Sequence, residues 1–138
     1  MAEKAKSPRA TRPLSPHLQI YRWPVTMAAS IAHRVTGLGL TAGTLLVTWW
    51  LVAAASGTDS YDFFSAAARS PAGQLVLFGF VWSLAFHLLN GVRHLAWDLG
   101  AGFELRTANR TGIAAVVLSF VLAVAVFAVA YVEKGLRA

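Results

Sequence analysis

The chain has 138 residues, of which 57% are hydrophobic and only 13% are charged, a composition that excludes an ordinary soluble domain and indicates a small membrane protein. It contains no cysteine, which excludes disulfides, thiolate metal sites and iron–sulfur clusters within the chain and leaves histidine to hold any iron. The formal net charge is +6, but the basic residues flank apolar segments, so we interpret them as topology signals and expect no nucleic-acid partner.

The first segment, residues 1–24, is polar and basic, and it lacks the apolar core of a signal peptide. We expect a cytoplasmic arm that ends in a short interfacial segment, where Tyr21 and Trp23 lie in the headgroup layer. No long amphipathic leader is evident, which favours the inner (cytoplasmic) membrane of a bacterium over the mitochondrial inner membrane.

Three long segments, residues 35–58, 71–92 and 111–132, contain no Asp, Glu, Lys or Arg. About 20 apolar residues suffice to cross the hydrocarbon layer, so each segment is long enough to span a membrane as a helix. Pro24 suits the start of a helix, which moves the expected beginning of the first helix to Val25. The sequence therefore predicts an all-α membrane protein, in which residues 25–138 form three transmembrane helices at about residues 25–55, 71–97 and 111–132.

Two polar segments connect the predicted spans: residues 57–70 join the first two, and residues 98–110 form a polar loop before the third. Basic residues concentrate on the cytoplasmic side of membrane proteins. With the N-terminus inside, nine of the 12 Lys and Arg residues lie on that side: Lys4, Lys6, Arg9, Arg12, Arg22, Arg34, Arg93, Arg106 and Arg110. Only Arg69, Lys134 and Arg137 lie on the other side, so we expect a cytoplasmic N-terminus and a C-terminus on the opposite side.

His87 lies in the second uncharged segment, where a polar side chain needs a ligand or a hydrogen-bonding partner. In a helix, His87 and His94 share a face about 10 Å apart along the axis, with Gly91 between them. Gly91 would leave a flat hollow beside the imidazole for a planar ligand such as haem, whose iron a neutral imidazole binds well. The alternative is that His87 hydrogen-bonds to a neighbouring helix and Gly91 merely allows close packing.

A second polar group, Ser30, His33 and Arg34, lies near the start of the first predicted helix, with Ser30 and Arg34 on one face. The expected topology brings this group and Arg93 and His94 of the second helix to the same membrane face. Alternatively, Arg34 and Arg93 simply extend to the lipid headgroups. We favour that alternative for Arg93, but less for Arg34, because Ser30 and His33 accompany it.

Three motifs together carry a resemblance to one family. They are Arg12-Pro-Leu-Ser-Pro-His-Leu-Gln-Ile-Tyr21, Ser30-Ile-Ala-His-Arg-Val-Thr-Gly37 and His87-x3-Gly91-x-Arg-His94-x3-Asp98. Over nearly its whole length, the chain resembles the cytochrome b subunits of succinate dehydrogenase, the larger membrane anchors of respiratory complex II. Either of the last two motifs alone would be weak, but the two together are quite specific.

The resemblance implies that His87 is an axial ligand of the iron of a b-type haem and that His94, His33 and Arg34 lie near its propionates. It also implies that Ser30 and Arg34 line a ubiquinone site, where a hydroxyl and a guanidinium can donate to a quinone oxygen as it gains electrons. Reduction of the quinone also consumes protons. Asp98 and Glu104 are candidates for delivering them, by position alone.

A six-coordinate haem needs a second axial ligand, yet His17 and His33 belong to the cytoplasmic surface and His94 shares a helix with His87. We therefore expect the second ligand to come from another polypeptide, which the resemblance identifies as the second, smaller membrane anchor. The resemblance also implies a flavoprotein subunit and an iron–sulfur subunit on the cytoplasmic face, in addition to the lipid bilayer.

No residue set in the chain could oxidise succinate, so we expect an anchor that is no enzyme on its own but contributes to the quinone-reduction site of succinate:ubiquinone oxidoreductase. One alternative is the anchor of a fumarate reductase, which works in the reverse direction. Another is a haem-free structural or transport subunit, in which His87 serves packing or proton movement.

Overall fold

The computed structural model describes residues 21–136. This part of the chain is helical throughout and contains no strand: α1 covers Val25–Ser56, α2 Thr58–Arg69, α3 Pro71–Asp98 and α4 Leu105–Leu136. The helices α1, α3 and α4 are long and apolar enough to cross a membrane, which confirms the predicted all-α fold and its three spans. Most of the predicted cytoplasmic arm lies outside the described residues.

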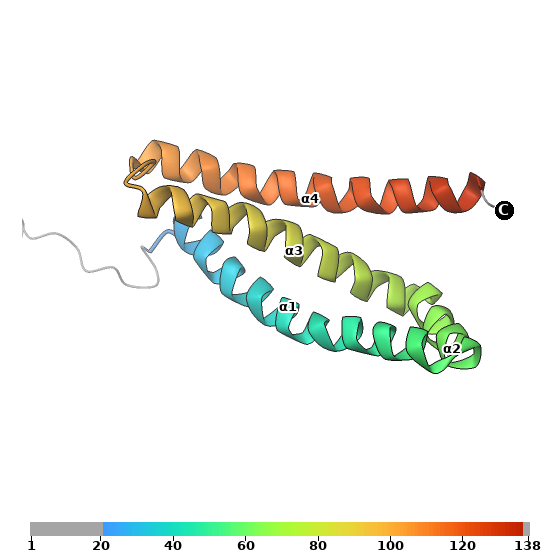
Figure 1. Ribbon diagram of the computed structural model, residues 1–138. Coiled ribbons are helices and arrows are strands. Elements are labelled where there is room, and N and C mark those ends of the chain that lie inside the picture. Colours follow the sequence, from blue (N-terminus) through green and yellow to red (C-terminus); the bar gives the residue numbers. More distant parts are fainter. Residues whose placement is uncertain (1–20, 137–138) are drawn as a thin grey trace, which may run out of the picture.

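The three long helices form a bundle in which α3 lies between α1 and α4 (Figure 1). At one end, α1 and α4 begin and α3 ends, and we call this the histidine end. There α1 also approaches α4, since a side chain at Gly112 would contact Val25. At the opposite end, the α2 end, the short helix α2 connects α1 to α3, and α4 stands apart from α1 in Figure 1.

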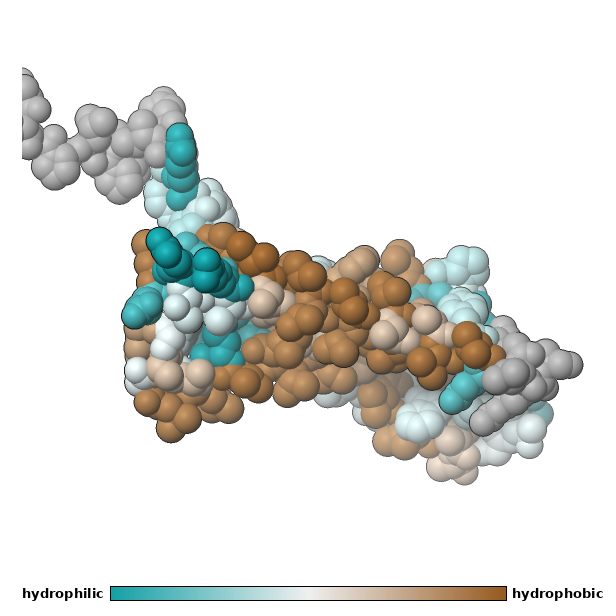
Figure 2. Space-filling model, turned by 90° about the horizontal axis from the view of Figure 1, so that it is seen from above, coloured by the Kyte–Doolittle hydropathy of each residue, from teal (hydrophilic) through white to brown (hydrophobic). Residues whose placement is uncertain are grey.

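The interior of the bundle is made mainly of small side chains. Ala29, Ala115 and Ala123 are buried, and Phe86 is the one large apolar side chain among the fully buried residues of the described part. Small residues let helices approach closely, which is how helices associate in lipid, where packing replaces the hydrophobic effect. Most large apolar side chains face outward and form the belt in Figure 2, with hydrophilic residues at its two ends.

Local sequence signals explain where the helices begin. Pro24 precedes the first residue of α1, as predicted, with extended backbone angles. At the start of α3, the backbone N–H of Gly73 donates to the hydroxyl of Ser70 over 3.0 Å, which caps the helix directly before Pro71. Gly57 has a φ of 106°, which other residues rarely adopt, and it separates α1 from α2.

The predicted polar loop at residues 98–110 is too long. Helix α4 begins at Leu105, where the N–H of Ala108 already donates to the carbonyl of Glu104 over 2.8 Å. The expectation was wrong because the first charge-free residue marks the edge of the hydrocarbon, whereas a helix extends into the headgroup layer as long as its backbone bonds continue. Residues 57–70, expected only to connect two spans, are themselves mostly helical.

The close contact between α2 and α3 predicts a cost for any side chain at Gly73. A Cβ atom there would overlap the backbone oxygen of Ala67 and the Cα atom of Ala68, so we expect Gly73→Ala to destabilise the protein by about 1–3 kcal/mol. Gly79→Ala, in the same helix, is the control, because its Cβ would meet nothing within 4 Å and alanine favours helix. Equal thermal midpoints for the two variants, measured by circular dichroism in mild detergent, would contradict this account.

Candidate functional site

Three histidines from two helices lie together at the histidine end. The rings of His33 on α1 and His87 on α3 are stacked, with centroids 3.8 Å apart and an angle of 12° between their planes. His94, two turns after His87, has its centroid 5.3 Å from that of His33. The structure therefore brings the polar groups of the two helices together, and it does so through His33.

The orientation of the His87 ring follows from its hydrogen bonds. Its Nδ1 atom lies 3.2 Å from the carbonyl oxygen of His33 and 3.4 Å from the hydroxyl oxygen of Thr36. A carbonyl can only accept, so Nδ1 carries the proton and donates it. Thr36 directs its own proton to the carbonyls of Ala32 and His33, which leaves its oxygen as an acceptor. With the proton on Nδ1, the imidazole form of this ring has its lone pair on Nε2.

The two glycines near His87 differ in what surrounds them. At Gly37 of α1, a Cβ atom would lie 3.2 Å from Cε1 of His87, so the absence of a side chain allows the ring to pack against α1. At Gly91 of α3, a Cβ atom would meet nothing within 4 Å. The space beside Gly91 is therefore open, as a planar ligand would require, and the close packing considered as the alternative is absent within the described residues.

This donor set fits haem better than a bare metal ion. Among residues 21–136, no three His, Cys, Asp or Glu side chains converge to hold a metal ion. His87 presents a single imidazole whose Nδ1–H is fixed by a backbone carbonyl, the arrangement that orients histidine ligands of metals. Nδ1 of His33 is buried without a partner in the described part of the chain, so it could bond to an added polar group.

The other predicted site residues lie at the same end of the bundle without joining the histidine contacts. Ser30 is half-buried and Arg34 is exposed, both in the first turns of α1. Asp98 is the last residue of α3 and Glu104 directly precedes α4, and both are exposed. These carboxylates are therefore open to water on the two sides of the short connection between α3 and α4.

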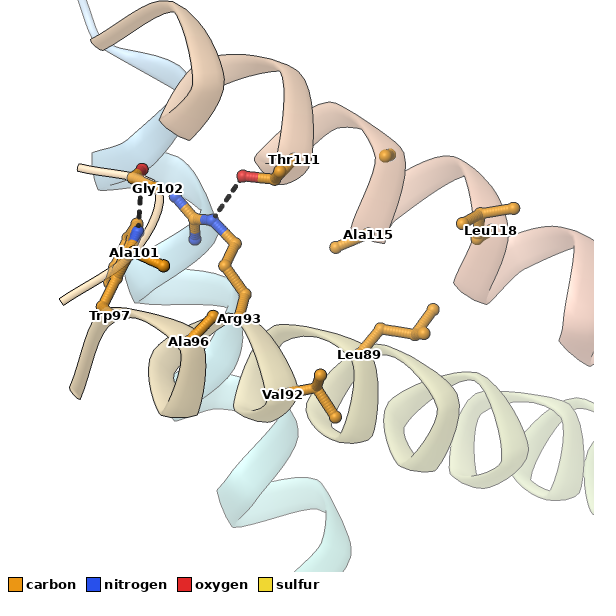
Figure 3. A pocket seen from close by; sticks show the side chains of 11 residues that line it. Leu89, Val92, Arg93, Ala96, Trp97, Ala101, Gly102, Thr111, Ala115 and Leu118 are labelled. Carbon is orange, nitrogen blue, oxygen red and sulfur yellow. Dashed lines mark hydrogen bonds between the residues drawn. The ribbon is translucent and has the colours of Figure 1, made fainter. Parts of the chain in front are cut away.

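Arg93 does not extend toward the headgroups, so the interpretation favoured from the sequence was wrong. It is only 7% exposed and reaches across to α4 (Figure 3). Its Nε donates to the Thr111 hydroxyl over 3.1 Å, Nη1 to Oδ1 of Asn90 over 2.9 Å and Nη2 to the carbonyl of Ala108 over 3.1 Å. The guanidinium also lies 4.0 Å from the ring centroid of Trp97, a cation–π contact.

A cavity of about 270 Å³ lies beside Arg93, between α3 and α4 (Figure 3). Leu89 and Val92 of α3 and Leu118 of α4 line it, so its walls are almost wholly apolar. The helical spacing turns Leu89 and Arg93 about 200° and 240° away from His87, so the cavity and the imidazole are on different sides of α3. This cavity is therefore not a haem site centred on His87.

Sequence reasoning missed three residues of this region: Thr36, Asn90 and Thr111. For Asn90 a signal was present, because an amide inside an apolar segment needs partners, and it is fully buried. Thr36 was part of a quoted motif, but its closeness to His87 depends on how α1 packs against α3. Thr111 stands at the edge of the uncharged segment, and nothing in the sequence connects it with Arg93.

Comparison with known proteins gives a consistent picture. A profile of the succinate dehydrogenase/fumarate reductase transmembrane subunit family matches residues 8–126. The chain is similar to the succinate dehydrogenase cytochrome b556 subunit of Paracoccus denitrificans, with 44% identity over 90% of this chain and 95% of that protein. The b556 subunit of Rickettsia typhi is 39% identical over 80% of this chain and 86% of its own length. The mitochondrial b560 subunit of Bos taurus is 38% identical over 83% and 69%.

The contacts of Arg93 predict that its loss loosens α4 from α3. Arg93→Met keeps much of the volume but leaves Thr111, Asn90 and the Ala108 carbonyl without their donor, and we expect a destabilisation of about 1–3 kcal/mol. Arg93→Lys should recover only part of this, because an ammonium group cannot reproduce the planar set of donors. The thermal midpoint in detergent tests both variants. Arg110→Met, at an exposed position of α4, is the control, and an equal effect there would count against the assignment.

Proposed function

The chain belongs to the succinate dehydrogenase/fumarate reductase transmembrane subunit family and is a cytochrome b membrane anchor of complex II, and from this premise we propose that it holds haem b through His87 and forms part of the quinone-reduction site. The observation that carries the proposal is the hydrogen bond from Nδ1 of His87 to the carbonyl of His33. It fixes the tautomer whose Nε2 can bind iron.

Haem, when bound, supplies one-electron redox chemistry at its iron. His87 would provide one axial ligand through Nε2, and the open space beside Gly91 on the same helix leaves room for a planar ring. His33, His94 and Arg34 are the groups proposed for the propionate region, and the unpartnered Nδ1 of His33 supports this role for its ring. Each of these side chains would act by binding and orienting.

The second axial ligand would come from a partner chain. His33 and His94 are the other histidines of the described residues: the His33 ring stacks on His87, and the His94 ring contacts that of His33 from the same helix as His87. We assign the ligand to a second small membrane anchor, so that haem is held between the two subunits. The iron–sulfur and flavoprotein subunits would dock at the histidine end and deliver the electrons of succinate.

Ser30 and Arg34 are proposed to bind ubiquinone. Their spacing on α1 places the hydroxyl and the guanidinium on one face, from which both can donate to a quinone oxygen. These bonds strengthen as negative charge develops on that oxygen, so they favour reduction over mere binding. Asp98 and Glu104, both exposed to water, would pass on the protons that the quinol requires.

The excess of Lys and Arg in residues 1–34 and 93–110 of the sequence supports a cytoplasmic N-terminus and a C-terminus on the other side of the membrane. The similarity to bacterial b556 subunits supports the bacterial inner membrane, although the bovine b560 subunit is also a relative. The names of these relatives favour a succinate dehydrogenase over the fumarate reductase that the family description also includes.

The haem assignment predicts that His87→Ala removes the α band of the b-type cytochrome from dithionite-reduced membranes containing the assembled complex. His94→Ala should only shift that band, since it would change the surroundings of the propionates and not an iron ligand. Both variants need matched expression, with the amount of chain determined by immunoblot. An unchanged band in His87→Ala would show that the iron is held elsewhere.

The quinone assignment predicts that Ser30→Ala and Arg34→Ala lower succinate:ubiquinone turnover by about tenfold each, since each removes a donor to a developing charge. Succinate oxidation with a water-soluble artificial acceptor should persist, because this activity does not need the quinone site. Arg106→Gln, an exposed arginine in the first turn of α4, is the control for a loss of charge at the same end. Equal loss of both activities in the Ser30 and Arg34 variants would indicate failed assembly instead.

A further inference from the structure

A second groove, at the α2 end, plays no part in the functions described above. It lies between α3 and α4 and has a volume of about 380 Å³, within the size range of small-molecule sites. Leu77 and Val81 of α3 form one wall, and Val126, Phe127 and Ala130 of α4 form the other. The trough of this α2-end groove is therefore apolar and runs along the helices within the membrane-spanning part of the chain.

The mouth of the groove is polar. Arg69, the last residue of α2, lines it together with Gln74 and Tyr131. The Tyr131 hydroxyl donates to Oε1 of Gln74 over 3.2 Å, and Nε2 of Gln74 donates to the carbonyl of Ala68 over 2.7 Å. Gln74 is thus held at both ends of its amide, whereas Arg69 brings a positive charge to the rim of an apolar trough.

The position of Arg69 supports a ligand that lies in the membrane. The distribution of basic residues places Arg69 on the side of the membrane opposite to the cytoplasm, where arginine is disfavoured. Only three basic residues of the sequence are assigned to that side. From Gln74 to Val81 the groove extends about 10 Å along α3, so it can take an elongated apolar chain whose charged end stays at the rim. An amphiphile with an anionic head and an acyl tail matches both features.

We propose that the α2-end groove binds an anionic phospholipid, with an acyl chain between α3 and α4 and the phosphate on the guanidinium of Arg69. The phosphate accepts charge-assisted hydrogen bonds from the planar donors of the arginine. The lipid fills the space that α3 and α4 leave open on this side of the bundle. It thereby adds contacts between the two helices at the end opposite to Arg93.

A photolabelling experiment on the whole complex tests this site. The complex is reconstituted into phosphatidylcholine vesicles that contain a small fraction of phosphatidylglycerol with a diazirine in its acyl chain, and labelled peptides are mapped after irradiation. We expect label on the residues 77–81 and 126–130. The yield should exceed that of the same diazirine on phosphatidylcholine by about fivefold, as one basic residue near an anionic headgroup implies.

Matched variants separate the charge from the trough. Arg69→Gln should lower labelling by phosphatidylglycerol to the level of phosphatidylcholine, while Arg69→Lys retains part of the preference. Ala130→Leu narrows the trough and should reduce labelling by both lipids, whereas Ala128→Leu, an exposed position of the same helix outside the groove, should not. All four variants should co-purify with the flavoprotein and iron–sulfur subunits in wild-type amounts, which shows that the complex is assembled.

Two results would overturn the proposal. Equal labelling by phosphatidylglycerol and phosphatidylcholine in the wild type would mean that ordinary lipid contact, without recognition of the headgroup, accounts for the groove. Absence of label from both helices, or label transferred to a partner subunit in their place, would mean that another chain covers this side of the bundle.

Discussion

Polar groups inside the apolar part of a bundle need partners within the protein, and three of those on α3 find them on a neighbouring helix. Toward α1, His87 donates to the carbonyl of His33. Toward α4, Arg93 bonds to Thr111, and Nε1 of Trp82 donates to the buried hydroxyl of Ser119 over 3.1 Å. Each contact joins α3 to a neighbouring helix, so the middle helix connects the whole bundle. If such a bond breaks inside the hydrocarbon layer, no water is present to take its place.

The three sides of α3 have different surroundings as a result. One side packs on α1, where Phe80 lies directly against Gly43 and would overlap any side chain there. A second side packs on α4. The third carries Leu84, Leu88 and Leu95, which are 51%, 62% and 62% exposed. Gly91 lies between Leu88 and Leu95 in the sequence and has open space beside it. This third side is therefore apolar and open, and it adjoins His87. A haem held between two subunits would need such a surface.

The sequence was sufficient for the part of the fold that depends on composition. Runs without charge identified the three spans, and Pro24 identified the first residue of α1. It was not sufficient where a residue's role depends on a distant partner. Arg93 carries a charge near the end of a span, so the sequence predicted an exposed side chain. Ala108 and Thr111 become its neighbours only when α4 packs against α3, and the sequence alone does not reveal this packing. Thr36 was missed for a related reason, since a threonine within a helix commonly bonds to its own backbone and here does so as well.

The motif His87-x3-Gly91-x-Arg-His94 combines two separate roles. His87, Gly91 and His94 repeat at intervals of four and three residues, which keeps them on one side of the helix. Arg93, six residues after His87, lies about 240° around the helix and therefore faces α4. In the sequence the charge of Arg93 stands directly before His94, but in the structure it stabilises the packing of α3 against α4. Such a division explains how α3 can be fixed against α4 through Arg93 while the space beside Gly91, on the side of His87, remains open.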